Sequence, residues 1–434
     1  MPNLGYKEAF LHYVWQFQYF DKSDIKTTSG ERVHVLSPGF LNKDSGPDFY
    51  NSKILINEVE WHGTTEVHYK TSDWINHNHT TDKAYNSVIL HLVWEEDIQI
   101  KRQDQTYIPT IELKNRVDKE VITLYQNLIK NTDKIPCEKS LPEVDEYFIY
   151  AMLEKALIER LELKSDQITK ILSKNINDWE QTCYQWIGKC FGFKINSDAF
   201  YQLCNNLPYS IARKYSGNRS GMDALMFGYA GFLNSSLVSD YTNRLKKEFA
   251  FLQSKHSIQS GMELPSWKFL RLRPANFPTL RIAQFSAFIA AVNGLTEMVF
   301  QNSLNDIKIS LSQSLDPYWS HHYHFEKEAS KDFDPSLGSI SIENLLINAI
   351  IPLRFAYANK YGDENLKSEC LELYKQIKAE KNHITLIYNE CGLKIPTSFE
   401  SQAFVHLHNV YCVKKQCLSC IIGHQIIHPV AESI

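Results

Sequence analysis

The spacing of apolar residues changes near position 118 and divides the chain into two parts. In the first part, short apolar or alternating runs are typical of strands, which we expect at 33–36, 53–57, 61–70, 87–94 and 107–117. One helix should precede them over 6–20, because Phe10, Val14 and Phe17 fall on one helical face. The first part is therefore predicted to consist mainly of strands.

From residue 118 onward the apolar spacing has a helical period. Helices are expected at 118–131, from 143 onward, and at 178–191, 241–255, 279–300, 342–361 and 368–381. Pro136 and Pro142 make residues 134–142 the best linker candidate. We therefore predict two domains, 1–133 and 143–434, of which the second is mainly α-helical and ends in a group of cysteines.

Length and composition add few constraints. A chain of 434 residues is long enough for two or three domains, and its formal net charge of -4 neither indicates nor excludes a nucleic-acid partner. Residues 1–18 lack the pattern of a signal peptide, and no apolar run reaches the ~18 residues of a membrane span. Nine unevenly spaced cysteines favour reduced thiols and a cytoplasmic location. The oligomeric state is not indicated.

The first candidate site consists of carboxylates on neighbouring strands. A turn at Gly46–Pro47 should place Asp48 at the start of one strand. In the next strand, Glu66, His68 and Lys70 are two residues apart and therefore lie on the same face. A pair of carboxylates suits Mg²⁺ or Mn²⁺, and His68 or Lys70 could orient a water molecule. In the alternative, Asp48 caps a turn and Glu66 is a solvated strand residue.

These residues make the N-terminal region resemble the PD-(D/E)XK nuclease superfamily. The resemblance is carried by Pro47-Asp48, by Glu66-Val67-His68, by Glu8 on the preceding helix, and by the expected order of elements. It implies an α+β/α fold, in which a mixed sheet with flanking helices precedes a mainly helical domain. It also implies that Asp48 and Glu66 ligate metal with Glu8 assisting. His68 stands where the superfamily has lysine, so His68 or Lys70 must replace that lysine or catalysis is lost.

A second candidate site follows the strand of Glu66. His77, His79 and Asp82 come about ten residues after His68, so all could line one pocket. Such a histidine-rich set would also admit Mn²⁺, Fe²⁺ or Zn²⁺. In the alternative, Asp82 caps a short helix, the two histidines are exposed in a loop, and His91 is a core histidine.

A third candidate site lies near the C-terminus. Cys412, Cys417 and Cys420 are separated by four and two residues, which suits Zn²⁺ or an iron–sulfur cluster. The fourth ligand is open, with His424, His428 and Cys391 as candidates. In the alternative, these cysteines pack as small apolar residues of a helix.

A basic segment at Trp267–Gln284 combines positive charge with aromatic residues. Such a mixture can bind a phosphate backbone and stack on bases. The predicted nucleic-acid-binding residues are Lys268, Arg271, Arg273 and Arg281. In the alternative, the segment connects two helices and its arginines pair with acidic residues.

The chain as a whole resembles a family of bacterial proteins known as a domain of unknown function. That resemblance is carried by Gly46–Phe49, Trp61–Trp94, Trp267–Gln284 and Ser401–Gly423, and it implies no activity. The leading hypothesis is a metal-dependent nuclease or related phosphodiesterase acting on nucleic acid. One alternative is a catalytically inactive scaffold that binds nucleic acid or protein. Another is a metal enzyme acting on a small molecule through His68, His77, His79 and Asp82.

Overall fold

The chain folds into two compact units. The computed structural model describes residues 7–233, 236–257, 262–301 and 303–428. Unit 1 comprises Met1–Met152, Glu390–Leu393 and Leu407–Ile434, and unit 2 comprises Leu153–Asn389 and Lys394–His406. This division differs from the expected domains 1–133 and 143–434, because the C-terminal cysteine segment belongs to the sheet-containing unit. Its Cys417 and Ile427 are buried in the same hydrophobic cluster as Trp15 and Leu92.

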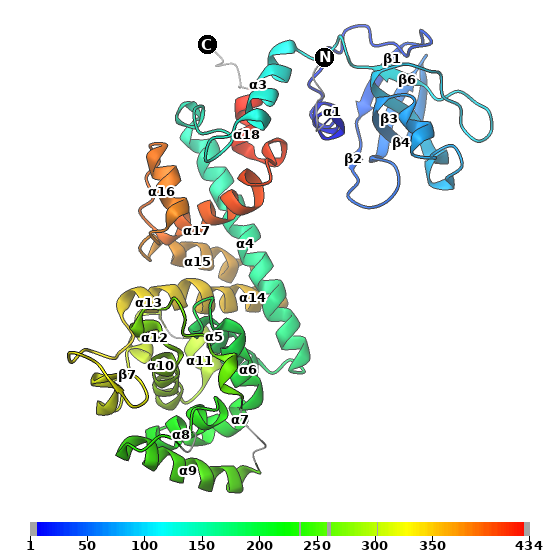
Figure 1. Ribbon diagram of the computed structural model, residues 1–434. Helices are drawn as coiled ribbons and strands as arrows, with labels where there is room; N and C mark the ends of the chain where they lie inside the picture. The colour runs from blue at the N-terminus through cyan, green and yellow to red at the C-terminus, as the bar shows by residue number, and fades with distance from the viewer. Residues whose placement is uncertain (1–6, 234–235, 258–261, 302, 429–434) are drawn as a thin grey trace. The chain divides into compact units, whose positions relative to one another are not determined.

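Unit 1 contains one mixed six-stranded sheet (Figure 1). Its strands follow the order β1-β3-β4-β5-β6, with β2 paired to β3. β3 is antiparallel to β1 and β4, whereas β4, β5 and β6 are mutually parallel. The strands are β1 (Val33–Ser37), β2 (Phe40–Leu41), β3 (Phe49–Ile56), β4 (Val59–Lys70), β5 (Val88–Glu95) and β6 (Thr110–Glu112). The mixed sheet confirms the predicted α+β class at this level.

Short helices flank this sheet and supply the connection between its parallel strands. The chain passes from β4 to β5 through a turn of helix and a 3₁₀ segment, α2 (Asp73–Asn76) and η1 (Lys83–Ser87). The other helical elements of unit 1 are α1 (Lys7–Gln16), α3 (Lys119–Lys130), η2 (Leu141–Glu143), η8 (Leu407–Cys412), η9 (Cys417–Ser419) and α18 (Ile421–Ile427). The loop between α2 and η1 carries the histidines described below.

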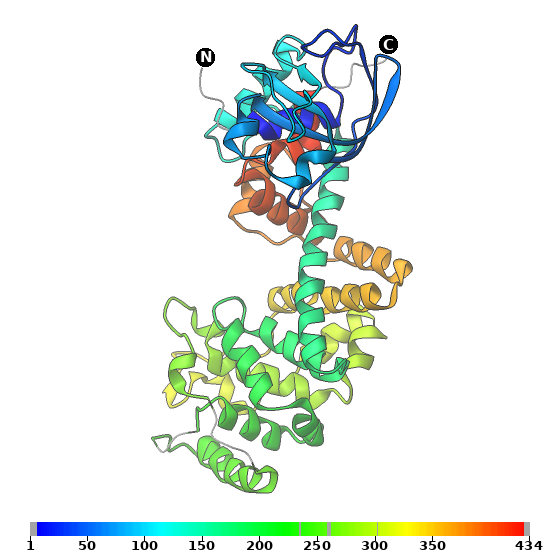
Figure 2. The same cartoon turned by 90° about the vertical axis from the view of Figure 1, so that its right-hand side faces the viewer.

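Unit 2 is mainly helical, as predicted for the second half of the chain (Figure 2). The boundary between unit 1 and unit 2 lies within the long helix α4 (Glu146–Lys174). The other long elements are α5 (Trp179–Phe191), α6 (Ser197–Asn206), α8 (Arg219–Tyr229), α9 (Asp240–His256), α10 (Pro278–Ala291), α11 (Leu295–Phe300), α12 (Leu304–Leu311), α13 (Ser339–Leu345), α14 (Ile351–Tyr361), α15 (Glu364–Lys375), α16 (His383–Glu390) and α17 (Ser398–His406). A two-stranded hairpin, β7 (His322–His324) with β8 (Lys327–Glu328), completes it.

Two expected helices are interrupted. The predicted helix 279–300 divides into α10 and α11, because Gly294 adopts an extended backbone that ends the helical path. Within 342–361 the π-helix η7 (Leu346–Ile350) separates α13 from α14. The stretch Ser339–Tyr361 is long and apolar enough to cross a membrane by length and composition, but 67% of its most apolar window is buried inside the structure. A core helix of a soluble protein satisfies the same criteria.

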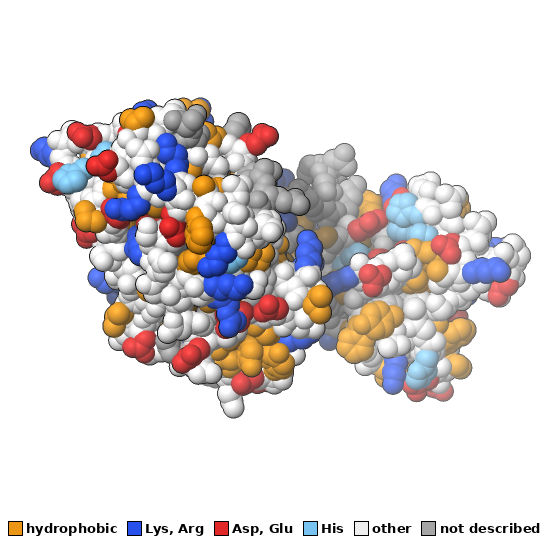
Figure 3. All heavy atoms as spheres, turned by 90° about the horizontal axis from the view of Figure 1, so that it is seen from below, with side chains coloured by type: hydrophobic (Ala, Val, Ile, Leu, Met, Phe, Trp, Pro, Cys, Tyr) orange, Lys and Arg blue, Asp and Glu red, His pale blue; other side chains and the backbone are white. Residues whose placement is uncertain are grey.

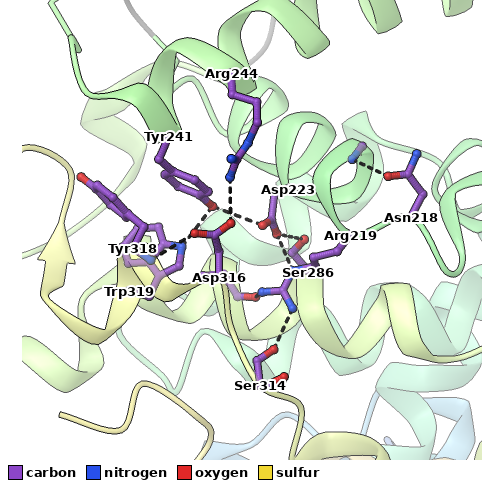
Figure 4. Close-up of polar contacts among 12 residues, drawn as sticks. Asn218, Arg219, Asp223, Tyr241, Arg244, Ser286, Ser314, Asp316, Tyr318 and Trp319 are labelled. Atoms are coloured by element: carbon purple, nitrogen blue, oxygen red, sulfur yellow. Dashed lines mark hydrogen bonds and ion pairs between the residues drawn. The ribbon is translucent and has the colours of Figure 1, made fainter.

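A buried carboxylate organises part of the core of unit 2 (Figure 4). Asp223 on α8 is 1% exposed, and its Oδ1 accepts hydrogen bonds from Arg219 Nε at 3.0 Å and Ser286 Oγ at 2.5 Å. Its Oδ2 accepts a third from the Tyr241 hydroxyl at 3.2 Å. Trp319 in turn donates to the Tyr241 oxygen at 3.1 Å. Because every side chain in this network has a partner, we interpret it as structural.

Candidate functional site: a histidine cluster beside β4

Three histidines converge at the end of β4. Ring nitrogens of His68, His77 and His79 all lie within 4.8 Å of one another, and His68 Nε2 is 3.1 Å from His77 Nδ1. His68 belongs to β4, whereas the other two follow α2. The His77 amide bonds the Asp73 carbonyl and the His79 amide bonds the Trp74 carbonyl, so the loop turns back toward the strand. The structure therefore brings together three residues from the two predicted sites.

Glu66 adds a carboxylate to these imidazoles. Its Oε1 lies 3.5 Å from His68 Nε2 and 3.4 Å from His79 Nε2. Glu66 and His68 share one face of β4, as their alternation predicted. Burial, followed by the charge of Asp48, raises the pKa of Glu66 to about 9. A cation among these groups would offset the cost of a buried carboxylate, so the donor set fits a metal ion.

His91 supports His68 from the neighbouring strand. The parallel register of β4 and β5 places His91 opposite Glu66, and His91 Nε2 lies 2.8 Å from His68 Nδ1. A proton on His68 Nδ1 would leave its Nε2 lone pair facing the cluster, which is how a metal-ligating imidazole is usually held. His91 was predicted as a core histidine, and it is indeed fully buried. Its position beside His68 could not be predicted without the register of β4 and β5.

The cluster favours neutral imidazoles. Burial, followed by His79 and His77, lowers the pKa of His68 to about 3. Burial is also the largest cause that lowers the pKa of His79 and that takes the pKa of His91 well below its ordinary value. Neutral imidazole is the form that coordinates a transition metal.

Asp48 lies beside Glu66 as predicted, and it contacts both β4 and a histidine of α1. Its amide donates to Glu66 Oε2 at 3.1 Å, and its Oδ2 accepts from the Val67 amide at 3.0 Å. The same oxygen lies 3.1 Å from His12 Nε2. Asp48 therefore joins the start of β3 to β4, and its role as a metal ligand stays a prediction. His12 of α1 was missed, although a polar residue between Leu11 and Tyr13 was a possible signal.

The remaining predicted residues of this region lie around the cluster. Glu8 is exposed in the first turn of α1, and its charge is the weakest contribution to the raised pKa of Glu66. Lys70 is exposed, with its Nζ 3.8 Å from Asp97 Oδ2. Asp82 caps η1 by accepting the Ala84 amide at 2.9 Å, as the alternative interpretation predicted. Among the described contacts, Lys70 does not reach the histidines.

Aromatic side chains line one side of the cluster, and another side is open. The ring of Tyr85 stacks on His79 with centroids 3.7 Å apart, and buried Trp74 packs edge-on against the same imidazole. His77 is exposed. A ligand set with one exposed member leaves room for water or substrate, which is typical of catalytic rather than structural metal sites.

The C-terminal cysteines lie in unit 1. Cys417 and Cys420 are each 8% exposed, and burial, followed by Cys420 and Cys412, raises the pKa of Cys417 to about 12. Of the predicted fourth ligands, His424 is engaged elsewhere. Its Nε2 lies 2.9 Å from the Tyr19 hydroxyl and its Nδ1 lies 3.3 Å from the Tyr13 hydroxyl. His428 stacks on Tyr19 with centroids 4.0 Å apart.

The basic segment of unit 2 is only partly on the surface. Lys268, Arg271 and Arg273 are exposed, but Arg281 is 6% exposed within α10. Its guanidinium donates to Gln284, Asn276 and Ser341. The prediction that Arg281 binds nucleic acid is therefore wrong, since a buried guanidinium cannot reach a phosphate. Figure 3 shows Lys and Arg side chains mixed with acidic and apolar ones on the face seen from below.

A mixed-sheet unit with a clustered set of three histidines and a glutamate, followed by a helical unit, defines a class of protein with a candidate metal centre. The chain belongs to the family described as "Protein of unknown function (DUF2851)", which it matches over residues 8–383. No curated protein and no solved structure matches it. The full-length resemblance is thus confirmed, and the nuclease resemblance stays a prediction.

Proposed function

We propose that this protein is a metal-dependent hydrolase that cleaves phosphodiester bonds of nucleic acid, with a metal ion held by His68, His77 and His79. The observation that carries the proposal is the convergence of three neutral imidazoles and the Glu66 carboxylate at a site open to solvent. Imidazole-rich sets favour Zn²⁺, Mn²⁺ or Fe²⁺ over Mg²⁺. This assignment moves the ion from the expected Asp48–Glu66 pair toward the histidines.

Each residue of the cluster would have a distinct role in binding the ion. His68, His77 and His79 would bind the ion, Glu66 would supply the nearest oxygen donor, and His91 would orient His68. A bound ion of this kind lowers the pKa of a coordinated water and stabilises charge on a phosphate. Asp48 would keep β3 and β4 in register beneath the site. The cytoplasmic location and the nucleic-acid partner remain part of this proposal.

The phosphodiester substrate is supported by the order of elements around the site. α1, the antiparallel strands β1, β2, β3 and β4, a short helical connection and the parallel strand β5 follow one another, which is the order that the resemblance implies with the two-residue β2 added. Asp48 directly precedes β3, and Glu66 and His68 lie in β4. Exposed Lys268, Arg271 and Arg273 supply positive charge that a phosphate backbone requires.

A small-molecule substrate is the second candidate, and the composition of the cluster favours it. Two of the imidazoles together with Glu66 also satisfy the two-histidine, one-carboxylate set of non-haem iron oxygenases. Iron retained through purification, with oxygen consumption and no nucleic-acid cleavage, would favour this candidate.

The test is cleavage of labelled single- and double-stranded DNA and RNA with Zn²⁺, Mn²⁺, Fe²⁺ or Mg²⁺. The wild type is compared with the double variant His77→Ala/His79→Ala and with His62→Ala. His62 is an exposed histidine of β4 that pairs with Glu60, so it controls for loss of an imidazole. We expect cleavage that a chelator abolishes, that the double variant lacks and that His62→Ala retains. Wild-type cleavage by the purified double variant would overturn the assignment.

A further inference from the structure

The loop after α3 is fastened to the C-terminal segment. Lys415 Nζ donates to the carbonyls of Ile129 at 2.5 Å and Asn131 at 3.0 Å. Asn131 in turn donates from Nδ2 to the Pro136 carbonyl at 2.9 Å, which fixes the peptide just before Cys137. Lys415 lies between Cys412 and Cys417, so these hydrogen bonds hold two cysteine-bearing loops against each other.

Three of the cysteines begin tight turns. The Lys415 amide bonds the Cys412 carbonyl at 3.1 Å, the Cys420 amide bonds the Cys417 carbonyl at 3.2 Å, and the Leu141 amide bonds the Cys137 carbonyl at 2.8 Å. At Lys415 the backbone is left-handed, with φ of 52°. Cys417 and Cys420 thus form a Cys-x₂-Cys loop, a ligand spacing that is typical of structural zinc sites.

The start of α18 is built against the same turn. A Cβ atom at Gly423 would lie 2.2 Å from the Cys417 carbonyl oxygen, so only glycine allows the helix to approach so closely. Cys417 and Cys420 are 8% exposed and Cys137 is half-buried. The close approach therefore holds these thiols in a compact, largely dry place.

Packing and electrostatics both relate a fourth thiol to the other three, since Cys137 packs against the hydrophobic cluster that contains Cys417. Burial, followed by Cys412, Cys420 and Cys417, raises the pKa of Cys137 well above its ordinary value. Cys391 behaves differently: after burial, the groups that act on its pKa are Glu138, Glu390 and Lys134 rather than these thiols. Both nitrogens of His424 face tyrosine hydroxyls and His428 stacks on Tyr19, so we take Cys137 as the candidate for a fourth ligand.

We infer that Cys137, Cys412, Cys417 and Cys420 bind one thiolate-ligated metal centre that joins the C-terminal segment to the loop after α3. Four thiolates bind either a zinc ion or an iron–sulfur cluster, and the spacing of four and two residues occurs in cluster-binding proteins of the plant ferredoxin type. This centre is separate from the histidine cluster and does not depend on the proposed hydrolase activity. A metal there would replace mutual repulsion of buried thiolates by strong bonds.

The experiment measures zinc, iron and acid-labile sulfide in the full-length protein purified without oxygen. We expect wild type, Cys391→Ser and His77→Ala/His79→Ala to retain this centre, and Cys137→Ser to lose it. Iron with sulfide would identify a cluster, and zinc alone would identify a zinc ion. Wild-type occupancy in Cys137→Ser would overturn the inference, as would a wild-type protein whose only metal is the metal that the histidine variant loses.

Cys137→Ser could fail to fold, so a second measurement uses the wild type alone. Alkylation of the native protein is mapped by mass spectrometry before and after removal of the metal. We expect the four cysteines to become reactive together as the metal leaves. Alkylation of Cys137 while the metal is still bound would overturn the assignment of Cys137 as a ligand.

Discussion

His68 Nε2 lies 3.1 Å from His77 Nδ1, although His68 belongs to a buried strand and His77 to an exposed turn. Both rings are within reach of His79, and Glu66 lies 3.5 Å from His68 Nε2. Two imidazole nitrogens at this distance can share one proton or one metal ion. The addition of a third imidazole and a carboxylate favours the metal ion.

His91→Leu should weaken metal binding although His91 is not a proposed ligand. The substitution removes the acceptor that holds His68 Nδ1 at 2.8 Å, so the ligand ring would lose its fixed orientation. Loss of such an outer partner typically costs about 10–100-fold in metal affinity. Competition titration with Zn²⁺ measures the change. His91→Gln, which keeps an acceptor, should recover part of the affinity, and equal affinities for wild type and His91→Leu would contradict the orienting role.

The metal-free protein should lose stability as the pH falls. The folded-state pKa of His68 is lowered to about 3, and those of His79 and His91 are also lowered, so the unfolded chain binds protons more readily. Their stabilising contribution is therefore present above the ordinary histidine pKa of about 6.5 and is lost as pH decreases below it. Thermal unfolding between about pH 7.5 and pH 5 measures the effect.

Glu66 acts on stability in the opposite direction. Its raised pKa gives a contribution that is present at low pH and is lost as pH rises through about 9. Glu66→Gln removes this contribution, so the acid-induced loss should be steeper in that variant than in wild type. A melting temperature of the variant that does not change with pH would contradict the histidine assignment.

Asp223→Ala should destabilise unit 2. The substitution leaves Arg219, Ser286 and Tyr241 without their shared acceptor in a buried place, which costs on the order of 3 kcal/mol. Asp316→Ala is the matched control. Asp316 caps a short 3₁₀ turn and pairs with the half-exposed Arg244, so its loss should cost about 1 kcal/mol. Urea unfolding followed by circular dichroism distinguishes them, and equal midpoints would contradict the structural role of Asp223.

Substitutions of exposed and buried arginines in the basic segment should have different effects. Arg271→Ala with Arg273→Ala should lower affinity for single-stranded nucleic acid and reduce its salt dependence, because each exposed guanidinium can neutralise a phosphate. Arg281→Ala should instead lower the stability of the fold, since it removes buried hydrogen bonds to Gln284 and Asn276. Fluorescence anisotropy at several salt concentrations tests the first effect. Unchanged affinity in the double variant would exclude this segment as the binding surface.

The sequence by itself determined the local elements where the periodicity was strong. The continuous apolar run that forms β5 and the Asp82 cap of η1 depend on residues within or next to each element, so no distant contact was needed to predict them. The same holds for the shared face of Glu66 and His68. The family could also be predicted from the sequence, and its match covers residues 8–383.

Only the tertiary structure decided which candidate residues meet. His91 joins His68 because β4 and β5 are parallel in a particular register, and register depends on pairing between distant segments. Arg281 is buried because α10 packs on all sides, which a count of charges does not reveal. Cys137 and Cys417 meet at one hydrophobic cluster, because that cluster holds the C-terminal segment against the N-terminal sheet. Spacing along a chain limits contacts between neighbours, whereas contacts between distant residues follow from how buried faces pack together.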